Sequence, residues 1–176
     1  MTHWHHAPPH RLKAVGAYMI TGATIHKKYY FYHPEHLNLL QSLLFELIES
    51  YGLGLKAWAI FSNHYHLILL TYPESGDPHQ FIRHLHSSSA RKLNKIEQRP
   101  GRRIWLQFWD TQLTYRNSYY ARMNYVINNP VHHGLVDDAK LYQWCSARWF
   151  ARNAEPGHYR TVMSFRSDKV NVIDTF

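Results

Sequence analysis

A pair of histidines separated by one residue is the clearest chemical signal in the sequence. His64 and His66 lie in an apolar stretch, Ala57 to Leu70, whose composition is typical of buried strands. In an extended strand alternate side chains share a face, so both imidazoles would point to the same side. Two neutral imidazoles side by side are good ligands for a divalent cation. The spacing therefore predicts two ligands of a metal site.

A tyrosine and an asparagine farther along could complete a set of groups that breaks a phosphodiester. Tyr125 and Asn129 are four residues apart, so on a helix they occupy the same face, although Pro130 disfavours helical geometry at Asn129. A phenol ionises only near about pH 10, so a tyrosine nucleophile needs a cation nearby, and Asn129 can offer that cation its amide oxygen. The two segments together predict metal-assisted phosphoryl transfer with Tyr125 as the nucleophile.

Two neighbouring tyrosines compete with Tyr125 for this role. Four residues after Tyr119 comes Met123, which offers no hard oxygen ligand, whereas Tyr120 is followed at the same spacing by Asn124. Only Tyr125 leads into an asparagine–proline block, and we therefore rank it first.

Composition and charge narrow the class of protein. The chain has 176 residues, the length of one domain, and its net charge of +8 indicates attraction to polyanions such as nucleic acids. Its single cysteine, Cys145, excludes an intrachain disulfide framework and fits a reducing compartment. We find no secretory signal and no apolar stretch long enough to cross a bilayer. We therefore expect a cytoplasmic protein with no membrane partner.

Hydrophobic patterning predicts an alternation of strands and helices. The order is strand, helix, two strands, helix, strand and a further helix, over 14–25, 34–51, 55–61, 64–70, 78–98, 104–109 with 113–115, and from 118 toward 130. This is the split βαβ repeat of ferredoxin-like domains, in the α+β class. We expect an antiparallel sheet with helices on one face and a ligand on the other, plus an added C-terminal helix that carries the tyrosine.

The expected domain organisation is simple. Residues 1–13 are predicted to form a flexible N-terminal arm, 14–150 a single domain, and 151–176 a C-terminal tail. The last stretch, 159–176, could be a strand, a docked tail or disordered.

Two motifs carry a resemblance to a known family. Ser62 to His66, followed by Tyr125 to Val136, resembles the REP-associated tyrosine transposases within the wider single-tyrosine HUH (insertion-sequence 200-like) transposase superfamily. Segments 105–115 and 142–147 are similar to that family too, so the resemblance covers roughly 14–150. The asparagine–proline block is distinctive for the family, whereas the histidine pair is shared with relaxases and replication initiators.

The resemblance implies a ferredoxin-like fold that binds single-stranded or hairpin DNA, such as REP-like repeats, and uses Mg²⁺ or Mn²⁺. By position, His64, His66 and Asn129 would be metal ligands, with many transposases carrying glutamine at the third position. Tyr125 would attack the phosphate and leave a 5′-phosphotyrosine link and a free 3′-hydroxyl. Related enzymes either pair subunits or act alone, so a homodimer remains open.

Basic residues near the expected site are candidates for contacts to DNA phosphates. They are Arg11, Lys13, Arg83, Arg91, Arg102 and Arg103.

Two alternatives compete with the prediction of a tyrosine-dependent DNA-cleaving enzyme. The first is a catalytically silent regulator that binds hairpin DNA on the same fold. The second is a zinc hydrolase, against which stands the lack of a His-Glu-x-x-His motif.

Overall fold

A four-stranded antiparallel sheet lies at the centre of the computed structural model, which describes residues 12, 15–168, 170 and 172. Its strand order is β2-β3-β1-β4, so β3 and β1 are the inner strands. The strands are Gly16–Thr24 (β1), Gly54–Ile60 (β2), His64–Thr71 (β3) and Trp105–Gln112 (β4). Apart from Leu12, which is buried in the core, the expected arm over 1–13 lies outside the described residues.

The helices follow the predicted order. They are α1 (Pro34–Ser50), α2 (Pro78–Ile96), α3 (Arg116–His132), α4 (Ala147–Asn153) and α5 (Pro156–Ser164), with 3₁₀ turns η1 (Ile25–Lys27) and η2 (Ala139–Leu141). β1-α1-β2 and β3-α2-β4 are the two halves of a ferredoxin-like α+β fold, as expected from the sequence.

Local sequence signals set the ends of α1 and α2. Gly52 follows α1 at φ +59°, and the Leu53 amide donates to the Ile48 carbonyl at 3.0 Å, which closes the helix with a glycine cap. At the start of α2 the Asp77 carboxylate accepts a hydrogen bond from the His79 amide at 2.8 Å, and Pro78 occupies the first helical position.

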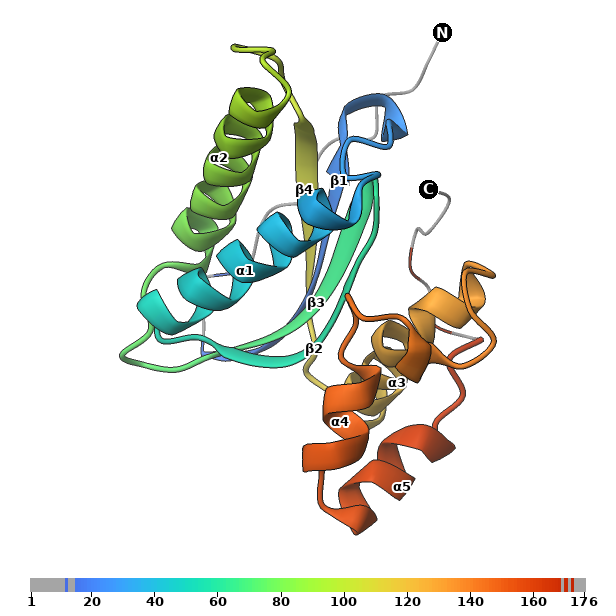
Figure 1. Ribbon diagram of the computed structural model, residues 1–176. Coiled ribbons are helices and arrows are strands. Elements are labelled where there is room, and N and C mark those ends of the chain that lie inside the picture. Colours follow the sequence, from blue (N-terminus) through green and yellow to red (C-terminus); the bar gives the residue numbers. More distant parts are fainter. Residues whose placement is uncertain (1–11, 13–14, 169, 171, 173–176) are drawn as a thin grey trace, which may run out of the picture.

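The two faces of the sheet bury two separate cores. Tyr65, Leu67 and Leu69 of β3 pack with α1 and α2, whereas Ile68 packs with the opposite layer built around α3. Figure 1 shows α1 and α2 on one side of the sheet and α3, α4 and α5 on the other. The alternation of β3 therefore sends its odd and even residues into different layers.

Two expectations need correction. The second face is not left open, because α3 packs on β2 and β3 there. Helix α3 begins at Arg116 and runs through Pro130 to His132, although the proline removes one helical hydrogen bond. Of the alternatives left open for 159–176, the docked one agrees with the described residues, because α5 packs on α3 and buries Val162.

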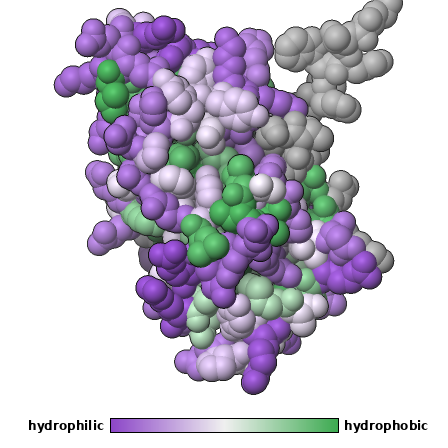
Figure 2. All heavy atoms as spheres, turned by 45° about the vertical axis from the view of Figure 1, so that its right-hand side comes forward, coloured by the Kyte–Doolittle hydropathy of each residue, from purple (hydrophilic) through white to green (hydrophobic). Residues whose placement is uncertain are grey.

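The surface is mostly polar. On the face drawn in Figure 2, hydrophilic residues cover most of the area and hydrophobic residues gather in its middle. Among the described residues, no helix is both long and apolar enough to span a membrane.

Tyr65 holds the inner strand β3 in place from the face of the sheet that packs on α1 and α2. Its ring is buried and lies against Gly22 of the paired strand β1, where an added Cβ would stand 2.6 Å from the Tyr65 hydroxyl oxygen and closer still to the ring carbons. The hydroxyl and the His86 Nε2 are 2.8 Å apart, and the His86 ring stacks on Trp105 at 4.4 Å. Burial raises the pKa of the Tyr65 hydroxyl and lowers the pKa of His86 to about 3, so a protonated phenol donates to a neutral imidazole.

Replacing Gly22 by alanine should destabilise the protein because the added methyl group has no room beside Tyr65. We expect the free energy of unfolding to fall by ~1–3 kcal/mol, the usual effect of overpacking, in urea denaturation. Gly157→Ala is the matched control, because nothing lies within 4 Å of its added Cβ. A Gly22→Ala protein as stable as the wild type would contradict this account of the packing behind β3.

Stability should fall with acidification through His86. Its pKa is about 3 in the folded protein against 6.5 for the unperturbed group, so between these values the unfolded chain binds a proton that the folded chain does not. The free energy of unfolding therefore decreases as the pH drops from about 6.5 toward about 3. His86→Gln should flatten this pH dependence in denaturation curves, whereas parallel curves for both proteins would exclude His86 as the source.

Candidate functional site

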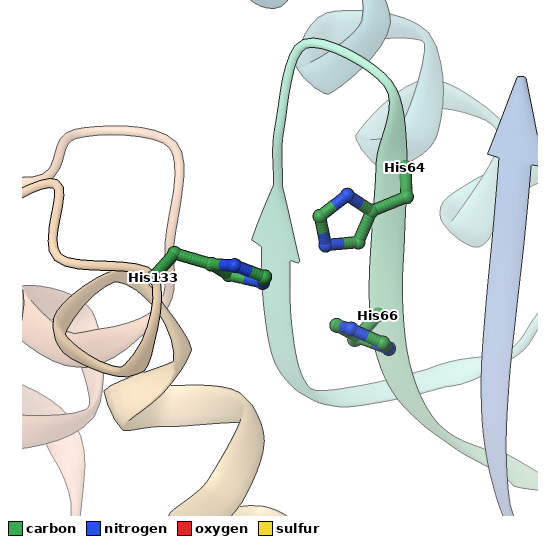
Figure 3. A group of neighbouring side chains, drawn as sticks. All are labelled: His64, His66 and His133. Atoms are coloured by element: carbon green, nitrogen blue, oxygen red, sulfur yellow. The ribbon is translucent and has the colours of Figure 1, made fainter. Parts of the chain in front are cut away.

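Two histidines of one strand and a third from a distant part of the chain lie close together at one end of the sheet. His64, His66 and His133 each offer a ring nitrogen, and these atoms all lie within 4.8 Å of one another. His64 and His66 are buried on β3, and His133 caps the C-terminal end of α3. Figure 3 shows the three rings turned toward a common space between the strand and the helix end.

Hydrogen bonds to neighbouring side chains orient the two strand histidines. The Asn63 Oδ1 is 2.7 Å from the His64 Nδ1, and the Asn63 amide group itself donates to the Lys27 carbonyl at 3.2 Å. Because Oδ1 can only accept, His64 carries its proton on Nδ1 and presents the Nε2 lone pair. The Thr21 hydroxyl and the His66 Nδ1 are hydrogen-bonded at 2.8 Å, which orients the second ring. Partners of this kind fix ring orientation in metal sites.

His133 owes its position to the end of α3. Gly134 adopts φ +66°, its amide donates to the Val131 carbonyl at 2.9 Å, and the Leu135 amide donates to the Pro130 carbonyl at 3.0 Å. This is the Schellman pattern of a glycine-terminated helix. It places His133 at the last turn, with its ring 4.9 Å from the His64 ring.

Tyr125 lies on the same side of the sheet as the histidines. Its side chain is only 7 % exposed, and its ring packs edge-on against the His66 ring at 5.7 Å. On its other side the His132 ring stacks on it at 5.6 Å, which restricts the orientation of the phenol.

Asn129 is fully buried on α3 and lies four residues from both Tyr125 and His133. The three residues therefore follow one another along one face of the helix. This spacing, followed by a glycine in capping position, is the signal from which His133 could have been recognised. Tyr125 and Asn129 are predicted from the sequence as site residues, whereas His133 is not.

The rival tyrosines occupy different surroundings. Tyr120 packs against His158 and Phe165, in and next to α5, at ring distances of 5.7 and 5.4 Å. Burial, together with the neighbouring Tyr120 and Tyr72, raises the pKa of Tyr119 to about 12. A higher pKa makes the Tyr119 phenolate harder to form.

Three of the candidate arginines line a common groove. Arg83, Arg102 and Arg103 border a cavity of about 520 Å³ between α2 and β4. Arg91 borders a neighbouring cavity of about 430 Å³ that Arg102 also lines. Arg11 and Lys13 lie outside the described residues.

The groove arginines differ in how firmly they are held. Arg102 forms an ion pair with Glu97 at 2.6 Å, donates to the Asn94 side chain at 3.0 Å and lies over the Tyr30 ring. Arg103 donates to two carbonyls at the start of β4, both at 3.2 Å. These contacts hold the guanidinium groups at the groove wall, whereas Arg83 and Arg91 are exposed on α2.

Comparisons with known proteins agree with this architecture. The family model described as "Transposase IS200 like" matches residues 17–129, more than half of the chain. No curated protein matches the sequence. A solved REP-associated tyrosine transposase bound to a REP hairpin is 15 % identical, with a TM-score of 0.69 over 87 % of each chain. A protein from Deinococcus radiodurans R1, proposed to be a transposase, is 18 % identical, with a TM-score of 0.47 over 70 % of this chain and 97 % of that one. The chain belongs to the IS200-like transposases, and its sheet and helices share the fold of a REP-associated tyrosine transposase.

Proposed function

We propose that this protein cleaves and rejoins single-stranded or hairpin DNA with Tyr125 as the nucleophile. The observation that carries the proposal is the contact between the Tyr125 and His66 rings, which places a phenol beside a cluster of three buried or half-buried histidines. Such a cluster next to a nucleophile is the arrangement that metal-assisted phosphoryl transfer requires.

The residues present suit a divalent cation such as Mg²⁺ or Mn²⁺. His64, His66 and His133 supply imidazole nitrogens, and Asn129 on the same helix face as Tyr125 supplies an amide oxygen. An amide oxygen is an ordinary ligand of Mg²⁺ and Mn²⁺, whereas imidazole nitrogens are more typical of transition metals, so this set of ligands suits Mn²⁺ better than Mg²⁺. A bound cation would polarise the scissile phosphate and favour the phenolate form of the nucleophile.

The chemistry follows from the groups in place. The Tyr125 oxygen forms a bond to phosphorus while the bond from phosphorus to the 3′ oxygen breaks. The phenolic proton is lost and the departing 3′ oxygen gains one, so the products are a 5′-phosphotyrosine and a 3′-hydroxyl. Attack of another 3′-hydroxyl on the phosphotyrosine reverses these bonds and joins the strands. Because the phosphodiester energy is conserved, no nucleotide cofactor is required.

Hairpin DNA is the substrate class that the surface supports. The net charge of +8 attracts polyanions, and the groove lined by Arg83, Arg102 and Arg103 offers guanidinium groups for phosphates. The similar transposase of known structure is bound to a REP hairpin, and we extend that class of ligand to this chain.

Tyr125→Phe should abolish the covalent adduct because the variant lacks the attacking oxygen. A labelled single-stranded hairpin incubated with protein and Mn²⁺ would be resolved on a denaturing protein gel, where the adduct migrates as a labelled protein band. Tyr120→Phe is the matched control and should retain adduct formation, since the Tyr120 ring faces α5.

Adduct formation by Tyr125→Phe at the parental rate would exclude Tyr125 as nucleophile. Hairpin binding without an adduct under every metal tried would identify a catalytically silent regulator instead.

His133→Ala should weaken binding of Mn²⁺ to the DNA-free protein by at least ~10-fold, because it removes one of three nitrogen ligands. Isothermal titration with Mn²⁺ measures this directly, and Asn129→Ala tests the amide ligand in the same assay. His84→Ala, an exposed histidine on α2, is the control. If His133→Ala bound Mn²⁺ with wild-type affinity, His133 would be excluded as a ligand and only His64, His66 and Asn129 would remain.

A further inference from the structure

The connection between β1 and α1 exposes an unusual combination of side chains. Residues 25–33, here called the 25–33 loop, present the basic Lys27 and Lys28 and the aromatic Tyr29 and Tyr32 at the surface. Tyr29 is 66 % exposed and Tyr32 is 56 % exposed, well above the other tyrosines near the site. Exposed aromatic rings beside cations are typical of surfaces that bind single-stranded nucleic acid.

The loop is held in a strained conformation. His26 and Lys27 both have φ of +54°, in the left-handed region that residues with a Cβ seldom adopt. Such strain persists only where surrounding structure imposes it, and it is common at ligand-binding sites.

Hydrogen bonds and one buried ring fix the base of the loop. The Thr24 hydroxyl donates to the Lys28 carbonyl at 2.7 Å, and the Phe31 amide donates to the Ser62 carbonyl at 2.9 Å. The Phe31 side chain is fully buried, with its ring 5.3 Å from the Trp105 ring. The loop therefore presents Tyr29 from a rigid support, which lowers the entropy lost when a base stacks on it.

A single side chain joins the loop to the histidine cluster. Asn63 donates to the Lys27 carbonyl at 3.2 Å with its amide nitrogen, and its oxygen holds the His64 Nδ1 at 2.7 Å. Asn63 therefore couples the backbone of the loop to the orientation of the His64 ring.

We propose that the 25–33 loop is a binding platform for the single-stranded DNA next to the cleaved phosphate. One base stacks on the Tyr29 ring, and Lys27 and Lys28 contact the adjoining phosphates. This inference rests on the proposed DNA-cleaving function and assigns it a substrate-contacting surface outside the histidine cluster and the arginine groove.

The test measures binding without cleavage. Fluorescence anisotropy of a short labelled single-stranded oligonucleotide, in chelator and without added metal, gives the affinity of each variant. Tyr29→Ala should weaken binding about tenfold, the usual scale for the loss of one stacked base. Tyr29→Phe keeps the ring and should bind like the wild type. Lys28→Gln should reduce the slope of log affinity against log salt by about one phosphate contact.

Tyr115→Ala is the matched control. Tyr115 is 78 % exposed and follows the far end of β4, whose first residue pairs with Thr24 beside the loop. Its removal should leave affinity unchanged. Equal affinities for Tyr29→Ala and Tyr115→Ala would overturn the platform while leaving adduct formation by Tyr125 untouched. Conversely, reduced binding by Tyr29→Ala in a protein that never forms an adduct would support the platform and reject the proposed cleavage.

Discussion

The site depends on how firmly β3 is held between two layers. Tyr65 points into the core formed with α1 and α2, where its hydroxyl meets His86 and its ring fills the space that Gly22 leaves open. The same strand turns His64 and His66 to the opposite face, toward α3. Because strand side chains alternate strictly, any shift of Tyr65 by one residue would exchange the two faces and remove both imidazoles from α3. The packing of Tyr65 on the α1 and α2 side of β3 thus determines that His64 and His66 face α3.

Much of this arrangement could be predicted from the sequence, because it follows from local rules. Period-two and period-3.6 patterns give the strands and helices, and the spacing of His64 and His66 gives their shared face. Gly52 gives the end of α1. The family resemblance is confirmed by the matching family model, and the predicted ferredoxin-like fold is the one observed.

Other features depend on tertiary contacts that no local pattern contains. Pro130 suggests a helix end, but the helix continues for two more residues and ends at a glycine cap, which places His133 in the cluster. The weak alternation after residue 159 conceals α5, which is stabilised by packing on α3 rather than by its own pattern. The sequence predicts a phosphate contact for Arg102, but it does not predict the ion pair with Glu97 and the hydrogen bond to Asn94 that hold this side chain. The roles of the individual residues in DNA cleavage stay predictions.

The helix α3 carries three of the proposed groups at once. Tyr125 and Asn129 lie on α3 and His133 lies at its C-terminal cap, whereas His64 and His66 belong to the sheet. A small tilt of α3 would therefore move the Tyr125 phenol and the two proposed ligands together. A cation bound by residues of both α3 and the sheet would restrict that tilt. Metal affinity and alignment of the phenol would then be thermodynamically linked: binding of the cation would favour the aligned position of α3 by the same free energy by which that position favours binding of the cation.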